Sequence, residues 1–276
     1  MPFCFINRDI IRLAGDGVIE WLSGLITNEI SGPSTFAALL TPQGKIIADF
    51  FIYKVGDSLL IDSPVNFTDA LEKRLRMYKL RAPITFEDTN FAVLTCWDED
   101  QDAIEGFIGY NKDEMMHFSD PRHPAIGTRI LIDDAWQTSG DYRSHLLSLG
   151  VPDSMWDFES SKVFPADANM DLLNGVDFKK GCFVGQEVVS RMKRMTTVKK
   201  RMRSFKFTGK ANPGDPILSG ERVIGNVLST YDQYGQVVEQ MGMAMTRLDR
   251  LRAAENALTL NGYSVEVMNS VDGLDH

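Results

Sequence analysis

The stretch Lys179–Glu187, which reads KKGCFVGQE, carries the residues whose types and spacing are best suited to chemistry. Cys182 lies between Gly181 and Gly185, and glycine lets a ligand approach the backbone closely. Two lysines precede the cysteine, and helical spacing begins at Gln186, so Cys182 sits just before a predicted helix N-terminus. Both features stabilise a thiolate. The pattern predicts a functional thiol, while the alternative of a small buried hydrophobe stays open because unpaired cysteine is often buried.

The other two cysteines, Cys4 and Cys96, are expected to be packing residues. Cys4 falls in a predicted strand, and Cys96 follows the apolar run Phe91–Thr95. Three cysteines cannot all pair, which argues against a disulfide framework. They are also too few for a four-cysteine zinc or iron–sulfur site within one chain, so no metal ligands are assigned.

The net charge of −9 conceals a basic stretch, Lys179–Lys206, which has ten basic residues and one acid, Glu187. The rest of the chain has 19 basic and 37 acidic residues, so the protein is not expected to bind nucleic acid over its whole surface. The stretch is either a solvated helix face or an anion site. An RNA partner ranks last, because only Phe183 and Phe205 are available there for base stacking.

Hydrophobic periodicity and turn signals predict a mixed α+β fold. Strands are expected at Phe3–Ile6, Phe36–Leu40, Ile46–Tyr53 and Ser58–Ile61, and helices at Gly17–Leu25, Asn66–Lys79 and Tyr142–Leu149. The last ~75 residues have the dense turn signals of a small barrel or sandwich. Strands are expected there at Arg203–Phe207, Arg222–Tyr231, Val237–Thr246 and Tyr263–Met268. A boundary near Thr197–Arg201 would divide the chain into residues 1–198 and 199–276.

The segment Lys180–Glu187 resembles the K-G-C-[YF]-x-G-Q-E signature of YgfZ-type proteins, a motif too long to expect by chance. Leu25–Ile30 and Leu39–Lys45 resemble two further segments of that family. The resemblance implies an aminomethyltransferase-like folate-binding region of ferredoxin-like units, followed by a C-terminal β-barrel. It also implies a relationship to the glycine-cleavage aminomethyltransferases and a role in assembling or repairing iron–sulfur enzymes.

The cofactor implied by this resemblance is tetrahydrofolate or a one-carbon derivative, bound between the Phe36–Asp49 hairpin and the Lys180–Arg191 segment. A pterin ring needs an apolar slot, for which Phe36 is a candidate wall, and its anionic tail suits basic side chains. Cys182 and Asp49 are the expected reacting groups. The expected folate contacts are Asn28, Phe36, Lys180, Gly181, Gln186, Glu187 and Arg191.

Two departures from the aminomethyltransferase pattern affect the expected activity. Those enzymes carry paired aspartates in a G-G-x-x-D-D hairpin, whereas Gly44–Asp49 reads GKIIAD, so Ala48 replaces one carboxylate and Asp49 retains the other. A register based on Gly150 places Ser148 where those enzymes have a glutamate that meets the pterin. Whether the chain is an enzyme stays open, and the alternative for Asp49 is a strand-end residue facing water.

Three functions are therefore considered. The leading hypothesis is a folate-binding accessory protein for iron–sulfur cluster proteins, with the assembly machinery or client enzymes as partners. The second is a folate-dependent aminomethyl- or methyltransferase, and the third is a tRNA-modification-related protein. Residues Met1–Asp16 show no signal- or transit-peptide pattern, so a cytoplasmic location is expected. No apolar run approaches the ~20 residues that span a membrane, so no membrane partner is expected.

Overall fold

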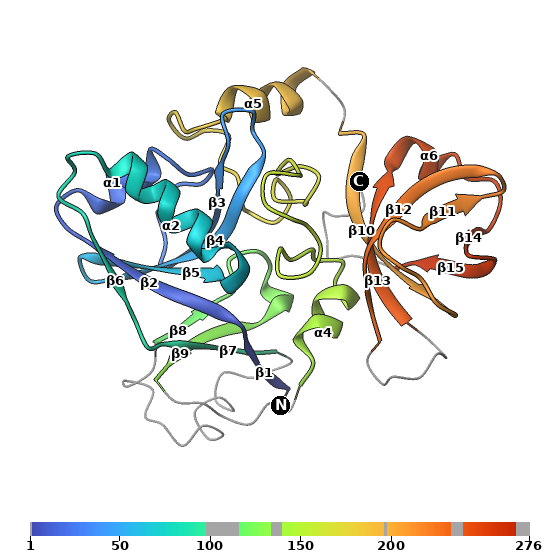
Figure 1. The fold of residues 1–276 in the computed structure, drawn as a ribbon, viewed down its shortest axis with the longest axis horizontal. Coiled ribbons are helices and arrows are strands. Elements are labelled where there is room, and N and C mark those ends of the chain that lie inside the picture. Colours follow the sequence, from blue (N-terminus) through green and yellow to red (C-terminus); the bar gives the residue numbers. More distant parts are fainter. Residues whose placement is uncertain (1, 98–115, 134–139, 196–197, 233–239, 269–276) are drawn as a thin grey trace.

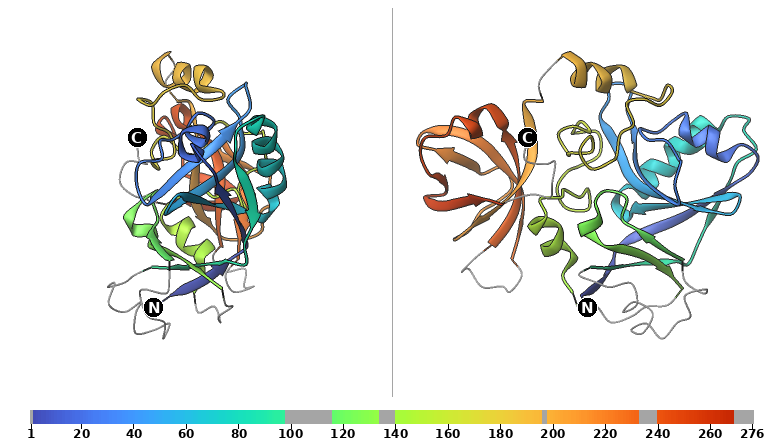
Figure 2. Two further views of the ribbon diagram at one scale, coloured as in Figure 1. Left: turned by 90° about the vertical axis from the view of Figure 1, so that its left-hand side faces the viewer. Right: turned by 180° about the vertical axis from the view of Figure 1, so that it is seen from behind.

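The computed structural model describes residues 2–97, 116–133, 140–195, 198–232 and 240–268. Within these ranges the chain forms two antiparallel β-sheets with helices, followed by a closed β-barrel (Figure 1). Seen from behind in Figure 2, the barrel stands beside the two sheets, with the irregular segment 151–185 between them. This arrangement confirms the predicted α+β class with a C-terminal barrel.

A five-stranded sheet, in the order β3-β4-β5-β2-β6, contains the strands predicted at Phe36–Leu40 and Ile46–Tyr53, which pair as a hairpin. The strands and the two helices packed against them are β2 (Arg8–Ala14), β3 (Ser34–Leu40), β4 (Ile46–Val55), β5 (Ser58–Pro64), β6 (Thr85–Asp88), α1 (Val18–Ser23) and α2 (Val65–Lys79). Helix α2 buries Phe67, Leu71 and Leu75, which recur at the helical repeat, against one face of this sheet. Strand β4 is buried almost throughout because its other face packs on a second layer.

That second layer is a four-stranded sheet in the order β1-β7-β9-β8. Its strands and the helices near it are β1 (Phe3–Ile6), β7 (Ala92–Cys96), β8 (Met116–Ser119), β9 (Thr128–Ile132), a 3₁₀ helix (Pro124–Ile126) and α4 (Tyr142–Ser148). The chain passes directly from β1 in this sheet to β2 in the other. The two sheets consequently share one core, which includes Ile6, Tyr53 and Leu131.

The segment 151–185 consists mainly of turns and leads into helix α5 (Gln186–Met195). It crosses the space between the sheets and the barrel (Figure 2). Val163 and Met170 of this segment are buried in the shared core, so the segment is packed although it lacks long regular elements.

The barrel closes in the order β10-β13-β12-β11-β14-β15. Its elements are β10 (Lys200–Phe207), β11 (Pro216–Ser219), β12 (Arg222–Tyr231), β13 (Gln240–Arg247), α6 (Leu248–Arg252), β14 (Leu258–Leu260) and β15 (Tyr263–Val267). Met202 and Met243 face outward into the core of the preceding region, and Arg201 pairs with Asp171 at 2.8 Å. The barrel is therefore anchored to the rest of the chain by apolar and ionic contacts.

Parts of three predictions lie outside the described residues. They are Thr197 of the predicted boundary, residues 237–239 of the strand expected at Val237–Thr246, and residues 269–276 of the expected C-terminal region. No helix in the described ranges is long and apolar enough to cross a membrane.

Candidate functional site

The loop that carries the cysteine motif packs against the turn between β3 and β4. Gly185 has a φ of 80°, and a Cβ at this position would lie 2.7 Å from the carbonyl oxygen of Thr41. Gly44 in the turn has a φ of 77°, and a Cβ there would lie 3.1 Å from the Cβ of Val188. Both the close approach and the left-handed backbone favour glycine at these two positions. The predicted meeting of hairpin and motif thus occurs at the hairpin turn.

Lys180 fixes the same loop to the end of α1 and to the chain that follows it. Its ammonium group donates hydrogen bonds to the backbone carbonyl oxygens of Ser23, Ile26 at 2.8 Å and Asn28 at 3.1 Å. Burial lowers the pKa of Lys180, and the nearby carboxylate of Glu29 opposes this change. An anionic ligand would have to displace these carbonyl groups to reach the ammonium, so Lys180 serves as an internal anchor.

Cys182 lies at the surface of this anchored loop. It is exposed, whereas Cys96 is buried and Cys4 is partly buried. This exposure rules out the alternative of a small buried hydrophobe for Cys182. Gly181 does not have the close approach predicted for it, because a Cβ there would have no neighbour within 4 Å. Gln186 closes the loop by donating a hydrogen bond to the carbonyl oxygen of Gly181 at 3.2 Å.

Most charged side chains of the basic stretch Lys179–Lys206 are exposed, but Phe183 and Phe205 are not. Exposed residues of the basic stretch and of α5 are Lys179, Glu187, Arg191, Lys193, Arg194, Lys199 and Lys200. Phe183 is only 8% exposed and Phe205 is 1% exposed, since both contribute to apolar cores. Base stacking on these two rings is therefore not available to an RNA partner.

Asn28 and Phe36 are occupied by contacts within the protein. The side-chain amide of Asn28 donates hydrogen bonds to the carbonyl oxygens of Phe36 at 2.9 Å and Asn174 at 2.6 Å. The ring of Phe36 is buried, with its centroid 5.1 Å from that of Phe51 and 5.5 Å from the guanidinium carbon of Arg122. Phe36 is consequently a core residue and does not wall an open slot.

Asp49 is buried within β4, where it pairs with Ala38 of β3 and accepts a hydrogen bond from the hydroxyl group of Ser154. The alternative of a strand-end residue facing water is therefore wrong. Burial, and next the charge of Asp153, raise the pKa of Asp49 to about 6. The hydrogen bond from Ser154 and the charge of Arg8 act in the opposite direction.

The two positions that depart from the aminomethyltransferase pattern lie in different surroundings. Ala48 is fully buried in the core that α2 covers, so a carboxylate there would lack water. Ser148 is exposed at the end of α4, and its hydroxyl group donates to the carbonyl oxygen of His145 at 2.7 Å.

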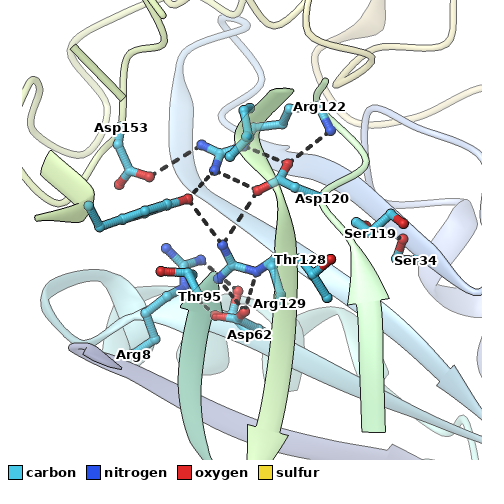
Figure 3. A network of polar contacts seen from close by, with 12 residues as sticks. Arg8, Ser34, Asp62, Thr95, Ser119, Asp120, Arg122, Thr128, Arg129 and Asp153 are labelled. Carbon is cyan, nitrogen blue, oxygen red and sulfur yellow. Dashed lines mark hydrogen bonds and ion pairs between the residues drawn. The ribbon is translucent and has the colours of Figure 1, made fainter. Parts of the chain in front are cut away.

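A buried ion-pair network, which the sequence did not indicate, joins the two sheets near Asp49 (Figure 3). Asp62 on β5 accepts hydrogen bonds from Arg8, from the Tyr53 hydroxyl group at 2.6 Å and from Arg129 at 2.6 Å. Burial alone would raise the pKa of Asp62, but Arg129 and Arg8 hold it below its ordinary value. The carboxylate is therefore held in its charged form inside the core.

The second half of this network centres on Arg122 (Figure 3). Its guanidinium group pairs with Asp120 at 2.8 Å and Asp153 at 3.3 Å, and donates to the Tyr142 hydroxyl group at 2.7 Å. Arg129 approaches Asp120 at 3.6 Å and thereby links the two halves. No local pattern in the sequence around Asp120-Pro121-Arg122 indicates this ionic role, because the partners Arg129, Tyr142 and Asp153 lie further along the chain.

These contacts decide how the expected folate residues can be used. Lys180, Asn28 and Phe36 are committed to the backbone or the core, and Asp49 is paired with Ser154. The apolar cavity beneath α5 is lined by neither Asp49 nor Lys180. These four residues would therefore have to give up their present contacts before they could bind folate.

Comparison with known proteins relates the chain to several named relatives. The chain is 30% identical over 229 residues to the mitochondrial iron–sulfur cluster assembly factor IBA57 homolog of Neurospora crassa, covering 71% of this chain and 51% of that protein. It is 25% identical over 296 residues to the mitochondrial iron–sulfur cluster assembly factor IBA57 of Homo sapiens, covering 96% of this chain and 82% of that protein. This chain is thus similar to iron–sulfur cluster assembly factors. It spans about half the length of the fungal relatives it matches.

The barrel and the overall fold have separate matches. Residues 199–270 match the family model of the CAF17 C-terminal beta-barrel domain. The crystal structure of glycine cleavage system aminomethyltransferase T from Bartonella henselae superposes with a TM-score of 0.75 at 13% identity, covering 97% of this chain and 85% of that one. At this identity the likeness shows the fold alone, and that fold is the one predicted.

The expected cytoplasmic location is contradicted by these comparisons. The curated relatives from Neurospora crassa, Mus musculus and Homo sapiens are all named as mitochondrial proteins. The pattern of residues Met1–Asp16, on which the expectation depended, is therefore not a guide to location here.

Proposed function

We propose that this protein is an accessory factor for the assembly or repair of iron–sulfur proteins, with Cys182 as its functional thiol. The observation that carries the proposal is the exposure of Cys182 on a loop whose backbone is fixed from two sides. Gly185 holds the loop to the β3–β4 turn, and Lys180 holds it to the chain after α1. Such anchoring presents the thiol in a defined position while leaving it available to a partner.

The number of metal-binding side chains implies that a partner protein supplies most of the cluster ligands. Within the described ranges, no three His, Cys, Asp or Glu side chains are grouped to hold a metal ion. A single thiolate can supply one ligand to an iron–sulfur cluster, whose sites ordinarily need four cysteines or their equivalents. We therefore propose that the cluster is cargo, held mainly by the partner, and that Cys182 contributes one ligand during assembly or transfer.

Labelling of the native protein tests this role. Iodoacetamide should alkylate Cys182 faster than Cys4 or Cys96, and an iron–sulfur carrier protein loaded with cluster should slow that reaction. The same carrier without cluster serves as the control, and peptide mass spectrometry identifies each labelled cysteine. If loaded and empty carriers leave the Cys182 labelling rate equal, the thiol does not meet the cluster and the proposal fails.

Folate binding is the second candidate, and the retained Asp49 with its raised pKa is the observation that favours it. The aminomethyltransferase-like fold is consistent with a folate-dependent transferase as well. Titration calorimetry with tetrahydrofolate and its one-carbon derivatives tests this candidate, with Asp49→Asn as the site variant. Absence of heat at millimolar ligand would remove folate from the account without affecting the role of Cys182.

A further inference from the structure

An apolar cavity of about 140 Å³ lies beneath the C-terminal half of α5. Its lining includes Pro165, Ala166, Val176, Phe178, Val189 and Met192. A dry protein cavity of about 150 Å³ accommodates a molecule the size of benzene. The space under the helix is therefore large enough for a small aromatic or branched aliphatic group.

The first turn of α5 packs against the hairpin turn and the shared core, and the cavity lies under the turn that follows. Val188 packs on Gly44 of the hairpin turn, and Val189 is buried in the shared core. The next turn of the helix, with Met192 and Lys193, spans the cavity. Apolar walls around such a space lose contacts that an apolar occupant would restore.

The charged groups at the cavity determine what kind of occupant suits it. The ammonium group of Lys193 lies 3.6 Å from the centroid of the Phe178 ring, at the edge of the apolar walls. The Asp171 carboxylate is neutralised by Arg201, which donates to its two oxygens at 2.8 and 2.9 Å. The lining thus presents a positive charge beside an apolar interior.

We propose that this cavity binds a small apolar carboxylate, such as an aryl or branched-chain acid. The apolar body packs between Phe178, Val189 and Met192, and the carboxylate pairs with Lys193. A bound ligand would also brace α5, which follows the Cys182 loop directly in the chain. This site is separate from the thiol and from Asp49, so the proposal goes beyond the function proposed above.

Binding of phenylacetate to the full chain, followed by methyl NMR and titration calorimetry, tests the proposal. We expect a dissociation constant of about 1 mM or lower, with shifts of the Val176, Val189 and Met192 methyl signals. The neutral analogue phenylacetamide should bind about two- to fivefold more weakly, because it cannot pair with the exposed ammonium group of Lys193. Equal binding of the two probes, or no binding of phenylacetate at about 10 mM, would overturn the proposal.

Two variants locate the site, with one matched control. Lys193→Gln should weaken phenylacetate binding about two- to fivefold, whereas Lys199→Gln, at an exposed lysine outside the cavity lining, should not change it. Ala166→Leu should abolish binding of both probes by filling the space, provided that its circular dichroism matches the parent. If Lys193→Gln and Lys199→Gln bind phenylacetate alike, the ligand does not occupy this cavity. Cys182→Ser should bind phenylacetate normally, which keeps this test independent of the thiol.

Discussion

The buried network around Arg122 and Asp62 and the surface loop that carries Cys182 are polar centres built in opposite ways. In the network, charged side chains satisfy one another, and three guanidinium groups also lie 3.8 to 5.1 Å from the centroid of the Phe51 ring. In the loop, glycine contacts and a lysine–carbonyl anchor fix the backbone, while the thiol stays exposed. Buried charge here holds two sheets together, whereas the thiol proposed to act in cluster assembly lies at the surface, outside these ionic contacts.

Removing a carboxylate from the network is expected to give the largest loss of stability. Asp62→Ala leaves Arg8 and Arg129 buried without their shared partner, which should cost about 3–5 kcal/mol of unfolding free energy. Urea denaturation measures the loss. The matched control is Asp249→Ala, which breaks an exposed pair with Arg247 and should leave the urea midpoint unchanged. Similar losses in both variants would show that burial does not distinguish these ion pairs.

The next largest effect is expected from Gly185, the second glycine of the motif. Gly185→Ala forces a left-handed backbone on alanine and places its Cβ 2.7 Å from the Thr41 oxygen. Thermal and urea unfolding should show a loss of about 1–3 kcal/mol. Gly181→Ala is the control, since its Cβ would meet open space and stability should hold. If Gly181→Ala destabilised the protein as much, the loop would not be anchored through Gly185.

The sequence predicted the elements and the presentation of Cys182 better than it predicted the surroundings of charged residues. Apolar runs on either side of the turn residues Pro42–Lys45 placed the β3–β4 hairpin, because such runs and turn chemistry are local properties. The flanking lysines and glycines indicated a special cysteine, which the structure places at the surface. A local pattern involves only residues that are close in the sequence, and the hairpin and the unusual cysteine are both defined by such residues. The sequence can therefore predict them without knowledge of the tertiary contacts.

Charged residues were harder to interpret because their partners lie far along the chain. Arg8, Asp62 and Arg129 each look like ordinary polar positions of a strand, and only the packing of two sheets brings them together. Lys180 was expected to meet an anionic ligand but binds backbone carbonyl groups, while Asp49 proved to be buried. Long-range contacts decide these roles, and no spacing within one segment encodes them.

A smaller effect, of opposite sign to that of Asp62, is expected at Asp49. Burial and Asp153 raise the pKa of Asp49 from 3.8 to about 6, so the native state holds the proton more tightly than the unfolded state. Its contribution to stability therefore falls as the pH rises from about 4 to about 6, and the full penalty applies above that range.

The variant Asp49→Asn removes this titration while keeping an oxygen that can accept from Ser154. It should match the parent near pH 4 and exceed its unfolding free energy by about 2–3 kcal/mol near pH 7.5. Urea denaturation at the two pH values measures the difference. A variant that is less stable than the parent at the higher pH would show that ionised Asp49 is instead stabilised by Arg8 and Arg122.

Replacement of Cys182 tests the central claim most directly, because it should separate function from stability. Cys182→Ser changes an exposed side chain by one atom, so unfolding free energy should stay within about 0.5 kcal/mol of the parent. In cells that lack the native protein, this variant should fail to restore iron–sulfur enzyme activity, whereas Gly181→Ala, the neighbouring control, should restore it. Full restoration by a stably folded Cys182→Ser protein would contradict the account, because the thiol would then have no part in cluster assembly.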